Sequence, residues 1–165
     1  MHHTKPTQNR EMRFGGLRVL VIACLLQLGH RAFAEPSLAA EENRDFERMV
    51  VLMQAGKESE ALLSASDFLR RYPKSERADD AQFVLAEVYF RQRQFHAALQ
   101  EFAKIPTMKN PGLDKVPDAG LRMGECWLNL GDKQKSQIEW GAVIRKYPKS
   151  PAASAARLRL AGIGS

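Results

Sequence analysis

The feature that most constrains the fold of this chain is an internal repeat. Residues 68–75 read FLRRYPKS and residues 143–150 read VIRKYPKS, so an apolar pair, a basic pair and a Tyr-Pro-Lys-Ser ending recur. Their separation equals two steps of a repeat of about 34 residues plus a short insertion. Repeats of this length are single supersecondary units that bury their apolar faces by stacking on one another. The sequence therefore predicts a solenoid.

A middle copy of the repeat is located by small and large residues at matching positions. Ala86, Tyr89, Ala98 and Phe102 are matched, at one constant displacement, by Gly124, Trp127, Ser136 and Trp140. The first copy has Leu52, Ala61, Ala65 and Phe68 at the corresponding positions. In a helix pair, a small residue lets the two axes approach, and a large side chain one turn away fills the space beside it. The insertion is predicted to be a loop at residues 109–116 (KNPGLDKV).

Signals for helix ends divide these copies into helices. Gly56 and Gly131 stand where the first helix of a pair should end. Tyr72 and Tyr147 each precede a proline that closes the second helix, and Ser75 and Ser150 are then available as N-caps. We expect an all-α, right-handed α-solenoid of about three helix-turn-helix repeats plus a C-terminal capping helix. Its predicted helices are 38–55, 58–71, 76–92, 95–105, 117–130, 133–146 and 151–161.

The first 34 residues have the three parts of a secretory signal. A positive region holds Arg10, Arg13 and Arg18. The apolar run at 19–28 (VLVIACLLQL) is too short to span a bilayer, and 32–34 (AFA) gives the small-x-small cleavage pattern. We expect cleavage after Ala34. The predicted organisation is a signal peptide at 1–34, a short segment at 35–41 and a repeat domain at 42–162.

Two points about this leader stay open. Translation could begin at Met1 or at Met12, since the signal is complete from Met12 onward. Residues 21–24 (VIAC) also resemble a bacterial lipobox, in which Cys24 would carry the lipid. We favour the soluble, periplasmic form over an outer-membrane-anchored lipoprotein. Both place the protein outside the cytoplasm.

Composition excludes several other classes. The chain has 25 basic and 19 acidic residues, but the leader holds most of the basic excess, so a nucleic-acid-binding footprint is not supported. Without Cys24 the only cysteine is Cys126, which rules out an intramolecular disulfide and reads as a small buried side chain. We find no metal-ligand spacing, no phosphate-binding loop and no nucleophile motif, and we expect neither cofactor nor enzyme activity.

The pattern resembles the tetratricopeptide repeat, and within it the exported bacterial type whose linkers run through a Tyr-Pro-x-Ser motif. Here those linkers are residues 68–81 and 143–156. The chain is similar to the C-terminal domain of the periplasmic Tol-Pal-associated cell-division coordinator, and also to outer-membrane assembly lipoproteins built from these repeats. We expect no N-terminal coiled coil like that of the first family, because the segment at residues 35–43 is too short for one. The middle unit replaces the Tyr-Pro-x-Ser motif by residues 104–106 (KIP) and the longer loop.

The resemblance implies a function and a site. It implies a protein-binding scaffold in the cell envelope that coordinates constriction, peptidoglycan or outer-membrane processes, acting as a monomer or a small partner-dependent assembly. Partners would bind a concave groove lined by the first helix of each unit. The implied groove residues are Phe46, Val50, Met53, Asp80, Phe83, Glu87, Phe90, Arg91, Leu121, Glu125 and Leu128, with Asn43, Gln54, Asp118 and Asn129 beside them. Apolar anchors next to carboxylates suit a peptide with apolar side chains and a basic or amide-rich flank.

Several single residues also have other interpretations. Any groove residue can instead pack within the fold. Asp79, Asp80 and Glu87 suggest paired carboxylates, but acids are favourable in a first helical turn and no nucleophile accompanies them. An accessory or hydrolytic envelope enzyme is the alternative of another class, and it lacks a catalytic group. His96 reads as a structural histidine, and Trp127 and Trp140 read as core aromatics.

Overall fold

The computed structural model describes residues 37–108 and 115–163, and 81% of these residues are helical. The predicted leader, with Cys24 and both candidate start positions, lies outside the described residues. Within them the chain forms seven α-helices, one short 3₁₀ helix and no strand. The elements are α2 (Leu38–Gln54), α3 (Glu58–Arg71), α4 (Ala78–Arg91), α5 (Phe95–Phe102), η1 (Ile105–Thr107), α6 (Lys115–Asn129), α7 (Lys133–Lys146) and α8 (Pro151–Ile163).

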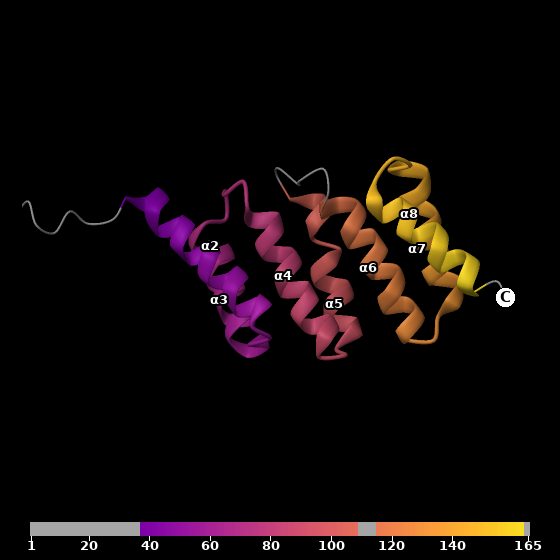
Figure 1. The fold of residues 1–165 in the computed structure, drawn as a ribbon, viewed down its shortest axis with the longest axis horizontal. Helices are drawn as coiled ribbons and strands as arrows, with labels where there is room; N and C mark the ends of the chain where they lie inside the picture. The colour runs from indigo at the N-terminus through magenta and orange to yellow at the C-terminus, as the bar shows by residue number, and fades with distance from the viewer. Residues whose placement is uncertain (1–36, 109–114, 164–165) are drawn as a thin grey trace, which may run out of the picture. The chain divides into compact units, whose positions relative to one another are not determined.

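The helices from α2 to α8 follow one another in chain order, each packed on the next (Figure 1). A second set of contacts joins alternate helices, from α2 to α4, from α4 to α6 and from α6 to α8. This is the packing of stacked helix pairs, in which the first helices of successive pairs form one row. The predicted all-α solenoid is confirmed. No helix in the described ranges is long and apolar enough to cross a membrane.

The small and large residues that marked the repeat form the interior of the helix pairs. Ala86, Ala98 and Phe102 are fully buried, as predicted. In the last pair, a Cβ atom built on Gly124 would lie 2.2 Å from Nε1 of Trp140, so only glycine permits this approach. Nε1 of the fully buried Trp140 donates a hydrogen bond of 2.9 Å to the carbonyl oxygen of Leu121. The two helices of this pair are thereby held at one spacing.

One predicted core aromatic is placed differently. Trp127 is only half-buried, and its ring lies under Nζ of Lys135 at 4.4 Å from the ring centroid. Its outer side is therefore covered by a lysine from the next helix. The position still contributes to the core, because Trp127 packs against the same cluster as the buried Cys126.

The turns inside the three helix pairs share one backbone conformation. Gly56 and Gly131 have φ values of +69° and +85°, as expected of glycines that end a helix. Arg93 occupies the same place in the middle pair with φ of +60°. This left-handed conformation costs a non-glycine residue about 1 kcal/mol, so the turn geometry is imposed there by the stacking of the helices.

Two serines were predicted to cap the helix that follows a Tyr-Pro motif, and only one of them does so. Oγ of Ser150 accepts a hydrogen bond from the amide of Ala153 at 3.1 Å, which caps α8 as predicted. Ser75 does not cap a helix beginning at residue 76. Its Oγ accepts a hydrogen bond from the amide of Arg77 at 3.0 Å, and α4 begins at Ala78, two residues after the predicted start. Ser75 therefore stabilises a turn before the helix.

The helix predicted at 95–105 is shorter in the structure. α5 ends at Phe102, and a 3₁₀ turn carries the chain through Pro106. Proline has no amide hydrogen to continue the α-helical ladder. The amide of Thr107 instead donates to the carbonyl oxygen of Lys104 at 3.0 Å, a bond of 3₁₀ type.

Candidate protein-binding face

The predicted groove residues lie on α2, α4 and α6, the first helices of the three pairs. We call this surface, together with the facing side of α8, the A-helix face. Its apolar members are all half-buried: Phe46, Val50, Met53, Phe83, Phe90, Leu121 and Leu128. Asp80 is half-buried as well, Glu87 and Glu125 are buried, and Arg91 is exposed. Half-burial means that these apolar side chains contribute both to packing between helices and to the surface.

Three phenylalanines of this face are each anchored in the fold by one ring edge. Phe46 meets Phe68 at 5.6 Å between ring centroids, and Phe83 meets Phe102 at 5.3 Å. Phe90 meets Phe95 at 5.6 Å. All three contacts are edge-to-face, the arrangement that aromatic pairs favour. Each ring is therefore held in a fixed orientation by the second helix of its own pair.

The other side of each ring faces a cation from the next first helix or its leading turn. The guanidinium of Arg77 lies 4.9 Å from the centroid of Phe46 and donates a hydrogen bond to Asn43. Cations over aromatic faces are attracted by the ring quadrupole, by about 0.5–1 kcal/mol at exposed sites. Asn43 stands three residues before Phe46, one helical turn away, so a single helix supplies both contacts of the cation.

The same arrangement occurs twice more along the row. Nζ of Lys115 lies 5.5 Å from the centroid of Phe83 and 3.0 Å from the Asp80 carboxylate. The guanidinium of Arg122 lies 5.3 Å from the centroid of Phe90, and its Nε is 2.6 Å from Oε1 of Glu87. Each acid again precedes its phenylalanine by three residues. The polar residue, the ring and the cation thus form one recurring unit.

A fourth copy lacks the aromatic ring. Glu125 is followed three residues later by Leu128, and Glu125 Oε1 lies 2.9 Å from Nη2 of Arg159 on α8. Glu125 also binds Arg122, with 2.6 Å between Oε2 and Nη1. Ion pairs therefore run without interruption from Glu87 on α4 through Arg122 and Glu125 on α6 to Arg159 on α8.

Burial changes the electrostatics of this chain of ion pairs. Burial raises the pKa of Glu87, and Arg122 and Arg91 only partly oppose the rise. Burial alone would lower the pKa of Arg122, but its hydrogen bond to Glu125 and the charge of Glu87 raise it instead. Oε1 of Glu87 is close to Arg122 yet has no aligned hydrogen bond, so one buried carboxylate oxygen is incompletely satisfied.

The cations of the face were missed from the sequence, and they change its chemistry. Arg77, Lys115, Arg122 and Arg159 were not among the predicted groove residues. Their partners lie 34 or 35 residues earlier, for example Asn43 for Arg77 and Glu87 for Arg122, which is the repeat period. Oppositely charged residues one repeat length apart in the sequence were the signal that could have identified these ion pairs. Because Asp80, Glu87 and Glu125 already pair within the fold, the expected attraction for a basic partner flank is not supported.

The other candidate residues form no catalytic arrangement in the described part of the chain. Asp79 is buried, and its Oδ1 accepts a hydrogen bond from the amide of Asp80 at 3.0 Å. His96 is exposed. Burial raises the pKa of the Cys126 thiol to about 12, which keeps it protonated and unreactive. No group of three or more potential ligands within the described ranges could hold a metal ion.

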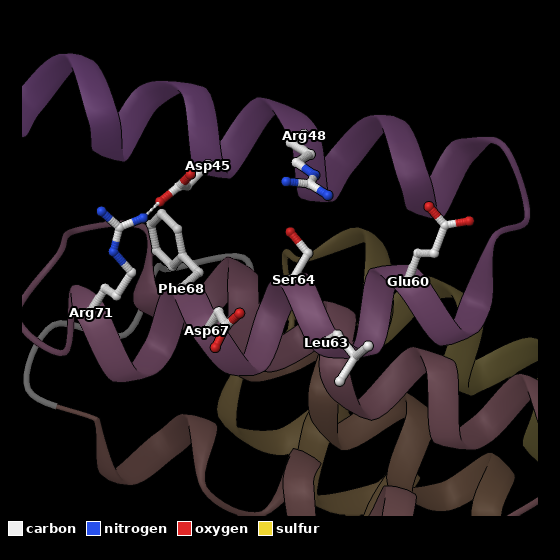
Figure 2. Close-up of a pocket in the computed structure, with 8 residues that line it drawn as sticks. All are labelled: Asp45, Arg48, Glu60, Leu63, Ser64, Asp67, Phe68 and Arg71. Atoms are coloured by element: carbon white, nitrogen blue, oxygen red, sulfur yellow. Dashed lines mark hydrogen bonds and ion pairs between the residues drawn. The ribbon is translucent and has the colours of Figure 1, made fainter. Parts of the chain in front are cut away.

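One pocket lies on the first helix pair, outside the A-helix face. It has a volume of about 330 Å³ and lies between α2 and α3, as Figure 2 shows. Arg71 at its rim forms ion pairs with Asp45 and, at 2.8 Å, with Glu41. None of its lining residues is a predicted site residue. Another pocket, of about 220 Å³, is lined by residues of η1, α6 and α7, among them Met123 and Val143, and by Tyr147 just after α7.

Comparison with known proteins identifies one repeat of this solenoid. Residues 118–150 match the tetratricopeptide repeat family, and they span most of α6, all of α7 and the turn that follows. The search of curated proteins found no match to the chain. The repeat supports a protein–protein interaction scaffold and points away from catalysis. The chain therefore contains a tetratricopeptide repeat at residues 118–150, within a helical solenoid of the same type.

Proposed function

We propose that the protein is an exported scaffold of the bacterial cell envelope that binds a partner protein through its A-helix face. Export rests on the signal-like leader at residues 1–34, which predicts a periplasmic protein. The resemblance to the Tol-Pal-associated coordinator favours a role in envelope constriction or peptidoglycan synthesis.

The observation that carries this proposal is the row of half-buried phenylalanines. Phe46 lies on α2, and Phe83 and Phe90 lie on α4. Each is half-buried, with an edge-to-face contact inside its own pair and a cation over its ring. Aromatic side chains, phenylalanine among them, are enriched at protein interfaces. Fixing them before binding lowers the entropic cost of association.

The test is affinity purification of the tagged mature chain from cross-linked envelopes, with partners identified by mass spectrometry. The variant Phe83→Ala with Phe90→Ala should lose most of its captured partner. The matched control is Leu63→Ala with Ile138→Ala, which removes two exposed apolar side chains from α3 and α7, the second helices of their pairs. Circular dichroism would establish that both variants remain helical. Equal capture by both folded variants and the parent would contradict the proposal.

An outer-membrane-anchored form is the alternative that Cys24 leaves open. In that form the scaffold would work with outer-membrane assembly proteins and would carry a lipid on Cys24. Metabolic labelling with a fatty-acid analogue distinguishes the two forms. Label on the parent chain that disappears in Cys24→Ser would establish the lipoprotein, and absence of label would leave the soluble form.

A further inference from the structure

We propose that Arg91, Arg122 and Arg159 form an anion-accepting subsite on the A-helix face, which takes an acidic side chain of the partner next to the apolar residue that covers Phe90. The inference rests on the proposed function, because it specifies the chemistry of the segment bound at that face. It reverses the basic flank that the sequence pattern favours.

The first observation is a layering of charge across α4, α6 and α8. The carboxylate side chains of Glu87 and Glu125 are each only 10% exposed. The side chains of Arg122 and Arg159 are 35% and 51% exposed, and Arg91 is an exposed residue. The acids thus lie beneath the cations. A partner that approaches this part of the face meets the guanidinium groups of Arg122 and Arg159 before the two carboxylates, and Arg91 adds a third, exposed cation one helical turn from Glu87.

The second observation is the number of hydrogen-bond donors that remain. A guanidinium has five N–H donors. Arg159 uses two of its nitrogens, Nε and Nη2, on one oxygen of Glu125. Arg122 donates from Nη1 to Glu125 and from Nη2 to Glu87. For Arg91 no hydrogen bond or ion pair is present within the described residues, although its charge acts on Glu87. The Nε of Arg122 also lies 2.6 Å from Oε1 of Glu87, so all three of its nitrogens face a carboxylate. Donors that no acid of the fold engages therefore remain mainly on Arg91 and on Nη1 of Arg159.

The third observation is that the scaffold holds two of the three arginines, Arg122 and Arg159, in place before any partner binds. Arg122 is fixed from two sides by Glu87 and Glu125 and lies over the ring of Phe90. Guanidinium groups oriented in advance lose little side-chain entropy when they bind a carboxylate. Phe90 gives the subsite an apolar neighbour. The expected partner segment therefore places Asp or Glu next to a large apolar residue.

The probe for the test is a phage-displayed library of random 16-residue peptides, selected on the immobilised mature chain. Enriched peptides should carry acidic and apolar residues together. The key variant is Arg91→Gln, because Arg91 is exposed and makes no hydrogen bond or ion pair within the described residues. It should weaken binding of the selected peptides by about two- to five-fold, as expected for one exposed charge contact. The control is Arg145→Gln, which removes an exposed charge of the same sign from α7.

The outcomes separate this inference from the proposed function. Basic or neutral enriched peptides whose binding is lost in Phe83→Ala with Phe90→Ala would overturn the anion subsite and leave the face intact as a binding site. Equal weakening by Arg91→Gln and Arg145→Gln would also overturn it, because only net charge would then matter. Peptide binding that survives loss of both phenylalanines, or a selection that enriches no peptide, would contradict the proposed function itself.

Discussion

Replacing Gly124 by alanine tests the close approach of α6 and α7, on which the last helix pair depends. The new Cβ would lie 2.2 Å from Nε1 and 2.5 Å from Cδ1 of Trp140, more than 1 Å inside ordinary van der Waals contact. Trp140 cannot yield, because it is fully buried and its Nε1 is bonded to the carbonyl oxygen of Leu121. Either the helices separate or the indole leaves its hydrogen bond.

The expected size of the effect follows from three opposing terms. Forcing extra volume into a packed core costs about 1–3 kcal/mol. Loss of the hydrogen bond from the buried indole adds about 1 kcal/mol. Alanine is the better helix former by about 1 kcal/mol, which offsets part of the cost. We therefore expect Gly124→Ala to lower the free energy of unfolding by about 2 kcal/mol.

The measurement is urea unfolding of the mature chain followed by far-ultraviolet circular dichroism. Gly141→Ala is the matched control on α7, since its new Cβ would meet only the flexible end of Arg145 at 3.3 Å. The control should be neutral or stabilising by up to about 1 kcal/mol, because only the helix-propensity term remains. A Gly124→Ala protein as stable as the control would refute the argument that glycine is required for the approach.

Three further predictions follow from charged and buried groups. Burial raises the pKa of Glu87 above its ordinary value of 4.5, so its carboxyl group keeps its proton to a higher pH in the folded state than in the unfolded state. The free energy of unfolding of the wild type should therefore fall as the pH rises from the ordinary pKa to the raised one. Glu87→Gln should unfold at a higher urea concentration than the wild type at neutral pH, but not at acid pH. The Cys126 thiol should resist a thiol-specific disulfide reagent in the folded chain and react once urea unfolds it, since burial raises its pKa to about 12; reaction at equal rates would contradict its burial. Asp132 caps α7 by accepting a hydrogen bond from the Lys135 amide, and its hydrogen bonds to Lys135 lower its pKa below 3.8. Its contribution to the stability of the fold is therefore present above pH 3.8 and is lost as the pH falls through the lowered pKa. Asp132→Ala should therefore lower the urea midpoint at neutral pH, and a difference that persists in strong acid would contradict the capping role.

Most helix boundaries were predictable because local rules decide them. The predicted helices 58–71 and 133–146 agree with α3 and α7 residue for residue. Glycines with positive φ end α2 and α6, as predicted. The boundaries that were predicted wrongly also have local causes, but the sequence pattern did not specify them. Pro106 ends α5 early, and the hydroxyl of Ser75 stabilises a turn before α4 begins.

The candidate face was predictable only in part. The helical phase of Phe83 and Phe90 placed them correctly on the first helix of their pair. Their covering by Lys115 and Arg122 was not predicted, because those cations stand on another helix, one repeat further along. Helical phase specifies which side of its own helix a residue occupies. It does not specify which side chain of the neighbouring helix meets it.

The sequence by itself determined the helix pairs, their stacking and the row of first helices, since periodic small, large and turn-forming residues leave few other ways to bury the apolar surface. The tertiary structure alone decided the charge that the A-helix face presents. The helices approach closely enough for Arg122 to reach Glu87 and Glu125, and this contact buries the acids and leaves the guanidinium groups outermost. Charge at a surface depends on which member of an ion pair the packing covers, and a linear pattern of charges does not specify that.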